Sequence, residues 1–267
     1  MEKGIIQLFP AFAGSASTTA EEMAAYMREA AERLCQVTGL AVIEGATIQH
    51  GHGAVYILGE EGEEQGIIAV GNVDHASYYY KSMFISRVGA GNTVIVPYTS
   101  NSYNQHGGLT LSITASSSVY MKYIKDGNTA VFRMGNGATA SASYNIGYFC
   151  LTQFGYGEGT KKNFMVCYSS SFYASYNSTL GNEIENTELF TVKNSYAPLV
   201  PPGSEALADI YISNAALPHM KLFTNRKNIA EWSVMQISGG KYAVMVKPSS
   251  GWTVLVRLDG AVSTENI

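Results

Sequence analysis

The sequence predicts a mainly β protein, with antiparallel strands in β-sandwich or barrel-like units and one N-terminal amphipathic α-helix. Between residues 119 and 173, four runs rich in Tyr, Val, Phe and Ile are each closed by Gly, Asn or Asp. Apolar runs separated by turn residues are typical of consecutive antiparallel strands. Helical spacing of apolar residues is confined to residues 19–37, so we expect a single helix beside the sheets.

The composition favours a surface that contacts other macromolecules. Charged residues make up 14% of the 267 residues, against about 25% in a typical soluble protein. The 27 Gly and 18 Tyr residues, with many Ser, Asn and Thr, occupy positions that Lys and Glu normally hold. The formal net charge of -4, with only 17 Lys and Arg residues, argues against nucleic-acid binding, because phosphate contacts require clustered positive charge.

The first 16 residues contain a short apolar run, residues 5–9, which Pro10 stops. We interpret this run as an edge strand or as an arm that reaches a neighbouring subunit. Its short apolar part and the early acidic Glu2 favour mature protein over a signal peptide. No apolar run in the chain approaches the roughly 20 residues that span a bilayer, so we expect no membrane insertion.

The predicted helix spans residues 19–37. Thr19 and Glu22 form a capping box at its start, and Gly39 is placed to end it. The helix has two candidate burial sites: the chain's own sheet, or equivalent helices in a symmetric oligomer. For the second alternative, the apolar stripe supplies four candidate subunit contacts: Met23, Met27, Leu34 and Val37.

From residue 40 onward the chain shows strand patterns and no further helical periodicity of useful length. An acidic turn at residues 59–65 separates two strands, and Gly239 with Gly240 marks a hairpin. Outside residues 119–173, the predicted strands are residues 40–44, 54–58, 66–70, 83–88, 92–96, 109–114, 187–192, 210–212, 221–224, 233–237, 241–246 and 253–258.

Composition shifts divide the chain into three parts. We predict an N-terminal arm and helix at residues 1–45, a β-meander or sandwich domain at 46–180, and a smaller β unit at 187–267. The last part begins around a proline-rich linker, where Pro201 and Pro202 lack the N–H donors that a central strand needs. These two prolines are further candidate subunit contacts.

The candidate metal ligands are His50 and His52, and His75, which lies beside Asp74, is the candidate that would complete the site. Two His residues two apart on a strand point the same way and suit zinc. However, the glycines around them favour an exposed turn. We therefore predict no metal site and no cofactor.

Catalytic motifs with the required context are not found in the sequence. The glycine-rich segment 155–159 is followed by a predicted strand rather than the helix that phosphate binding needs. No Ser lies in a GxSxG motif. The sequence therefore predicts no catalytic residue, and we expect that the protein is not an enzyme.

The three cysteines, Cys35, Cys150 and Cys167, form neither an even set nor a CxxC pair. We expect buried free thiols, as in a protein made in a reducing cytoplasm. A bridge between Cys150 and Cys167 across adjacent strands is the alternative.

Three consecutive tyrosines, Tyr78, Tyr79 and Tyr80, form a candidate ligand patch. Aromatic rings beside Asn and Ser side chains bind sugars and protein epitopes. The alternative is that Tyr fills strand positions, for which it has a high propensity.

Two segments of the C-terminal third, NSYAPLVPPGSEALADIYIS (residues 194–213) and SVMQISGGKYAVM (233–245), carry a family resemblance. They resemble virion structural proteins of tailed bacteriophages and prophages of Gram-positive gut bacteria. In that family a proline-containing linker precedes a β-hairpin unit, here with Ile237, Lys241 and Tyr242. The stretch VYMKYIKDGNTAVFRM (119–134) is similar to a strand pair of such proteins. The resemblance implies a component of a head, neck or tail and implies no catalytic residue.

Together these patterns predict a bacteriophage structural protein that acts through repeated subunit contacts. Its expected partners are copies of itself and other virion proteins, and its expected location is the virion, assembled in the bacterial cytoplasm. The alternative is a carbohydrate- or receptor-binding module such as a tail-tip adhesin, whose partner is a cell-surface glycan. A third hypothesis is a β-rich hydrolase that acts on glycans.

Overall fold

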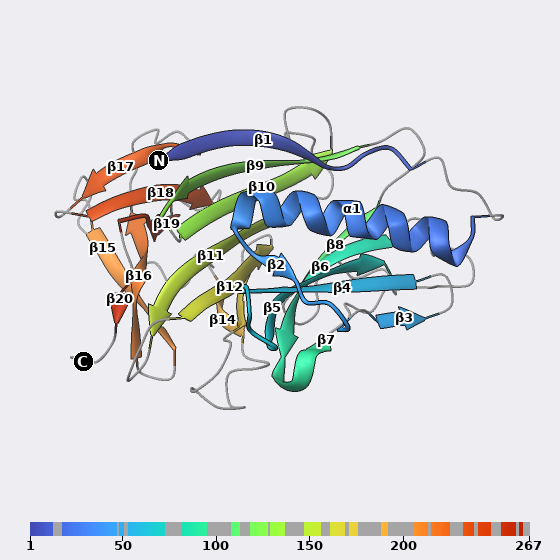
Figure 1. Cartoon of the computed structure of the whole chain (residues 1–267). Coiled ribbons are helices and arrows are strands. Elements are labelled where there is room, and N and C mark those ends of the chain that lie inside the picture. Colours follow the sequence, from blue (N-terminus) through green and yellow to red (C-terminus); the bar gives the residue numbers. More distant parts are fainter. Residues whose placement is uncertain are drawn as a thin grey trace.

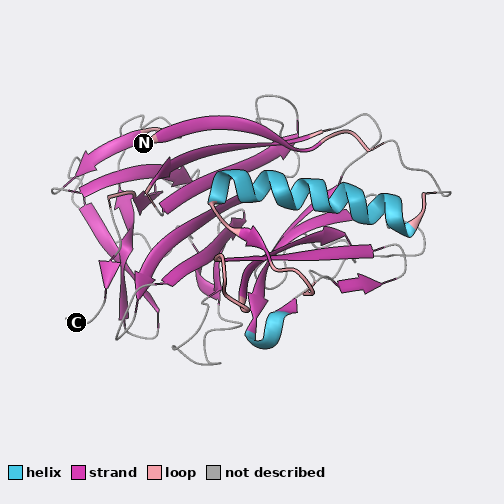
Figure 2. Cartoon of the chain, viewed as in Figure 1, coloured by secondary structure: helices cyan, strands magenta, loops and turns pink. Residues whose placement is uncertain are grey.

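The computed structural model describes residues 1–12, 18–46, 48–50, 53–72, 82–94, 108–112, 118–127, 129–136, 147–155, 161–168, 171–175, 188–191, 206–212, 215–224, 232–237, 240–246, 252–259 and 262–263. In these ranges the protein is mainly β, with largely antiparallel sheets and one α-helix (Figures 1 and 2). The predicted fold class is confirmed at this level.

The predicted meander forms most of one sheet, called here the first sheet. Its strand order is β1-β9-β10-β11-β12-β13-β14, with β20 pairing parallel to β11. The strands are β1 (Glu2–Phe9), β9 (Val119–Asp126), β10 (Thr129–Asn136), β11 (Gly147–Gly155), β12 (Lys161–Tyr168), β13 (Ser171–Ser175), β14 (Glu188–Thr191) and β20 (Val262–Ser263). β9 to β13 follow one another as hairpins, as the alternation of apolar runs and turn residues predicts.

The chain between α1 and β9 forms the second sheet, whose order is β2-β4-β5-β6-β7, with β3 beside β4 and β8 beside β6. Its strands are β2 (Ala41–Val42), β3 (Ile48–His50), β4 (Gly53–Gly59), β5 (Gly66–Asn72), β6 (Ser82–Gly89), β7 (Thr93–Val94) and β8 (Gly108–Ser112). Every residue of β4 and β5 is buried. Their near-continuous apolar sequences reflect a sheet that is covered on both faces.

The helix α1 (Ala20–Thr38) is the helix that the sequence predicts. The Thr19 hydroxyl accepts a hydrogen bond from the Glu22 amide at 3.2 Å, and the Glu22 carboxylate accepts one from the Thr19 amide at 2.8 Å. Gly39, at φ 71°, donates to the Cys35 carbonyl at 2.8 Å and ends the helix. The capping box and the terminal glycine are therefore confirmed.

The helix and both sheets contribute to a single core. Phe132 and Phe149 of the first sheet stack at 4.5 Å between ring centroids, and they share this core with Met27 of α1 and Leu58 of β4. Figure 1 shows α1 running alongside β4. The apolar stripe of α1 thus packs on the chain's own sheets, which is the first of the two alternatives that the sequence left open.

Three side-chain hydrogen bonds fix α1 to the strands around it. The Tyr26 hydroxyl donates to the Pro10 carbonyl at 2.5 Å, and the Tyr56 hydroxyl of β4 donates to the Ala24 carbonyl at 3.1 Å. The Arg33 guanidinium donates to the Leu8 carbonyl at 3.3 Å. These bonds set the position of the helix along β1 and β4.

The C-terminal strands form a third sheet, in the order β15-β16-β19-β18-β17. The strands are β15 (Ala206–Ile212), β16 (Ala215–Thr224), β17 (Val234–Ile237), β18 (Gly240–Val246) and β19 (Trp252–Arg257). β18 lies against β10, and the Lys241 ammonium pairs with the Asp126 carboxylate at the end of β9. Ile124, Val131 and Cys150 form a buried cross-strand row on the face of the first sheet opposite the shared core.

Several predicted strands differ in extent from those observed. The predicted strand 210–212 is the end of β15, which begins four residues earlier at Ala206. The predicted strand 221–224 is the end of β16, which begins six residues earlier at Ala215 and contains Pro218. The ladder between β15 and β16 is irregular between Asp209 and Tyr211, so a residue without an N–H is tolerated there. The predicted strand 40–44 is reduced to β2, because a turn begins at Glu44.

Candidate functional site

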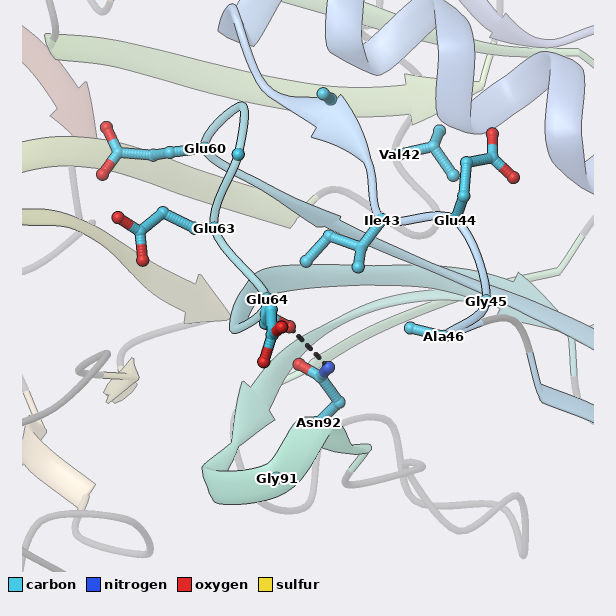
Figure 3. A pocket seen from close by; sticks show the side chains of 12 residues that line it. Val42, Ile43, Glu44, Gly45, Ala46, Glu60, Glu63, Glu64, Gly91 and Asn92 are labelled. Carbon is cyan, nitrogen blue, oxygen red and sulfur yellow. Dashed lines mark hydrogen bonds between the residues drawn. The ribbon is translucent and has the colours of Figure 1, made fainter.

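The candidate site is an open hollow of about 740 Å³ beside the second sheet, shown in Figure 3. Three segments that lie apart in the sequence line it: the connection after β2, the turn between β4 and β5, and the short 3-10 helix η1 (Ala90–Asn92). The lining residues are Ala41, Val42, Ile43, Glu44, Gly45, Ala46, Glu60, Gly62, Glu63, Glu64, Gly91 and Asn92.

Two amide side chains brace the turn between β4 and β5 against η1. Asn92 accepts a hydrogen bond from the Gly66 amide and donates one to the Glu64 carbonyl, both at 2.8 Å. Gln65 donates to the Gly89 carbonyl at 2.9 Å and accepts from the Gly91 amide at 3.1 Å. Asn92 adopts φ 59°, a left-handed conformation that Asn tolerates better than most residues. The rim of the hollow is therefore held by hydrogen bonds that fix its backbone.

The charged side chains that line the hollow are all acidic. Glu44, Glu60, Glu63 and Glu64 all contribute to its lining. A negatively charged hollow attracts cationic groups and repels anionic ones.

The Glu44 carboxylate is paired with an arginine of α1. The Arg28 guanidinium of α1 lies 2.7 Å from the Glu44 carboxylate and 2.9 Å from that of Glu32. The hydrogen bond from Arg28 lowers the pKa of Glu44. Glu44 is therefore ionised at neutral pH, and it lacks the raised pKa of a general acid.

The described thiols are poor nucleophiles. Cys35 and Cys150 are free cysteines. Burial raises the pKa of Cys35 to about 11 and raises that of Cys150 further. Both thiols are protonated at neutral pH, whereas the thiolate is the reactive form. Cys150 lies opposite Met165 on β12 rather than opposite Cys167.

The predicted helix contacts lie inside the molecule. Met23, Met27 and Leu34 have no exposed surface, and Val37 is 7% exposed. All four side chains belong to the core that α1 shares with the two sheets. They contact the chain's own strands and present no surface to a neighbouring subunit in this fold.

The other predicted site residues fall largely outside the described residues. Pro201 and Pro202, the tyrosines Tyr78, Tyr79 and Tyr80, and the residues His52, Asp74 and His75 lie there. His50 ends β3, and its side chain is also outside the described part. Among the residues that the structure describes, no group of three His, Cys, Asp or Glu side chains is arranged to hold a metal ion.

The run at residues 5–9 belongs to an edge strand of the chain's own first sheet. β1 lies at the end of that sheet and pairs with β9. Lys3, Ile5 and Gln7 are exposed on one face of β1, and Ile5 has 49% of its surface exposed. An exposed isoleucine on an edge strand is a second candidate site, for contact with protein.

No protein-family model, curated protein or solved structure matches this chain. In the described ranges, no helix is both long enough and apolar enough to cross a membrane.

Proposed function

We propose that this chain is a structural component of a bacteriophage virion, in a head, neck or tail, that acts through repeated subunit contacts. The observation that carries the proposal is the edge strand β1, with Ile5 exposed at 49%. An edge strand with exposed apolar surface is a template for pairing with another chain. The resemblance of residues 194–213 and 233–245 to virion proteins supports the same function.

The architecture fits such a role. We infer that the first and second sheets form a β-sandwich, because their side chains meet in one core together with those of α1. A sandwich of this kind supplies a rigid body whose edges can be repeated by symmetry. The low charge content, 14% of residues, also suits a surface that is covered in an assembly.

We favour contact over catalysis because the carboxylate of the hollow that pairs with Arg28 lacks the raised pKa of a general acid. A glycoside hydrolase needs one carboxyl group with a raised pKa beside a second carboxylate. In the hollow, the pKa of Glu44 is lowered by Arg28. The proposed partners are copies of this chain and other virion proteins, and the proposed location is the virion.

The test is the mass of the purified chain in solution, measured by light scattering over a range of concentrations. A defined multiple of 28.7 kDa is the expected result. A monomer at every concentration that also fails to bind assembled phage particles would contradict the proposal. The receptor-binding alternative would be favoured if the chain is a monomer that binds glycans and if replacing Tyr78 and Tyr80 by Ala abolishes that binding.

A further inference from the structure

We propose that β1 pairs with β1 of a second copy of this chain, in antiparallel orientation about a two-fold axis through Ile5. The first sheets of the two copies then form one continuous sheet. This inference rests on the proposed function, since it names the partner and the register of one subunit contact.

One edge of β1, the one away from β9, is available for pairing in the described part of the chain. In the part of the chain that the structure describes, β1 pairs with β9 alone and ends the strand order of its sheet (Figure 1). The contacts of α1 with β1 include Leu8 and Phe9, through the Arg33 hydrogen bond and the stacking of Phe9 with Tyr26. The strand before them carries no proline and no bulge, and such features commonly protect natural edges.

One face of β1 is exposed and carries the side chain of Ile5. Gly4 lies opposite Tyr123, whose hydroxyl donates to the Glu2 carboxylate at 2.5 Å. Successive side chains of a strand point to opposite faces. Gly4 and every second residue from it therefore lie on the face of β1 that points to the shared core, whereas Lys3 and Ile5 lie on the other face and are exposed. Among the described residues, the large hydrophobic side chains that are exposed are Met1 and Ile5. Ile5 therefore marks the apolar centre of this face.

The sequence of β1 limits the register that two β1 strands can adopt in an antiparallel pair. Residues whose N–H and C=O groups point outward recur at every second position, so a symmetric antiparallel pair of identical strands is centred on a residue. Centring on Ile5 places the two Ile5 side chains side by side and places Lys3 opposite Gln7 of the second copy. No like charges then face each other across the pair.

Other arrangements of the same two strands are worse. Centring on Gly4 would place Lys3 opposite Ile5, and centring on Ile6 would carry the ladder into the irregularity between Gln7 and Phe9. A parallel pair in register would set Lys3 beside Lys3, and like charges directly opposite are destabilising. The pairing of the two Ile5 side chains and the absence of facing like charges thus favour a second copy paired through Ile5.

Cysteine cross-linking tests this register directly. In the Ile5→Cys variant the two cysteine Cα atoms would lie about 4.5–5.5 Å apart, within the range of about 4.4–6.8 Å that a disulfide spans. Mild oxidation should therefore yield a covalent dimer, detected by intact mass without reductant. Wild-type protein, which has Cys35, Cys150 and Cys167, is the control for cross-links from native thiols.

Two further variants fix the register. In Lys3→Cys the two cysteines would lie four residues apart along the strands, about 14 Å, so this variant alone should remain uncross-linked. A mixture of Lys3→Cys and Gln7→Cys should give the mixed dimer. A cross-link in Lys3→Cys alone, or none in the mixture, would overturn the register.

A charge variant tests the energetics. Ile5→Lys should raise the dissociation constant of the dimer by about tenfold or more, because it removes the apolar contact between the two Ile5 side chains and sets two Lys side chains opposite each other. The matched control is Gln36→Lys, which adds the same charge at an exposed position of α1 and should leave the constant unchanged. Far-ultraviolet circular dichroism checks that both variants fold.

The outcomes separate this inference from the proposed function. The β1 pairing would be overturned if the protein forms an oligomer, Ile5→Cys gives no cross-link and Ile5→Lys leaves the dissociation constant unchanged. The proposed assembly role would then still stand, through another surface. A wild-type chain that is monomeric at every concentration in light scattering would overturn the pairing. The same result would also argue against self-assembly of the chain.

Discussion

At the scale of single residues, the contact of Tyr123 with Gly4 fixes β1 on β9. A Cβ atom at Gly4 would lie 2.5 Å from the Tyr123 hydroxyl oxygen and 2.6 Å from its ring. Only glycine leaves room for the ring at this distance. The same tyrosine donates to Glu2, and this hydrogen bond raises the pKa of Tyr123. Tyr123 therefore helps to hold the start of β1 on β9, together with the ion pair between the N-terminal ammonium and Asp126.

We predict that Gly4→Ala lowers the free energy of unfolding by about 1–3 kcal/mol, the usual cost of overpacking. Urea denaturation measures the change. In a Tyr123→Ala background the same substitution should cost much less, since the clashing ring is absent. An equal cost in both backgrounds would show that the ring is not the cause.

Asn92 combines a left-handed backbone with two hydrogen bonds, to Gly66 and Glu64. We predict that Asn92→Ala loses about 1–3 kcal/mol of stability, because both bonds are lost and Ala is strained at this φ. Asn92→Gly loses the same bonds without the strain and should be the milder variant by thermal unfolding. The reverse order would contradict this account of the brace.

At the scale of elements, α1 is held by its buried stripe. Leu34 has no exposed surface, so we predict that Leu34→Ala costs about 2–5 kcal/mol of unfolding free energy. Gln36→Ala, on the exposed face of the same helix, should stay within about 0.5 kcal/mol of wild type. Denaturant titration of both variants is the measurement, and a wild-type stability for Leu34→Ala would exclude the stripe from the core.

Elements with strong local signals could be predicted from the sequence. The capping box at Thr19 and the alternation in residues 119–136 depend only on near neighbours, so α1, β9 and β10 follow from them. β16 was only partly predicted, because Pro218 argues against a strand when the irregular ladder beside it is unknown. The pairing of β16 with β15 decides where β16 begins, and the residues of β16 alone do not.

At the scale of the whole molecule, the third sheet is tied to the first by Lys241 and Asp126. The hydrogen bond from Lys241 lowers the pKa of Asp126. A carboxyl group whose pKa is lower in the folded state stabilises the fold above its unfolded pKa of about 3.9. That stabilisation is lost as the pH falls through the folded-state pKa.

We therefore predict that the stability of wild-type protein falls more steeply than that of Asp126→Asn as the pH is lowered below about 4. Urea denaturation between neutral and acidic pH measures both slopes. Lys241→Met should flatten the wild-type slope in the same way, because the partner charge is removed. Parallel slopes in all three proteins would contradict a role for this pair.

The candidate site could not be predicted, because it is assembled from distant segments. The hollow joins the turn after β2, the turn before β5 and η1, and the hydrogen bonds of Gln65 and Asn92 cross between the last two. Each segment alone has the pattern of an ordinary polar turn. The burial of Met23 and Met27 by the chain's own sheets likewise depends on strands that follow far along the sequence.

The pairing of β1 with β9 also affects biosynthesis. Glu2 lies beside Lys125 in the finished sheet, so the first strand emerges from the ribosome long before its partner. At typical elongation rates of about 5–20 residues per second, the delay is roughly 6–25 s. During that interval Ile5, Ile6 and Leu8 have no strand to pair with, and nascent chains of this protein have a period in which chaperones can bind their N-terminus.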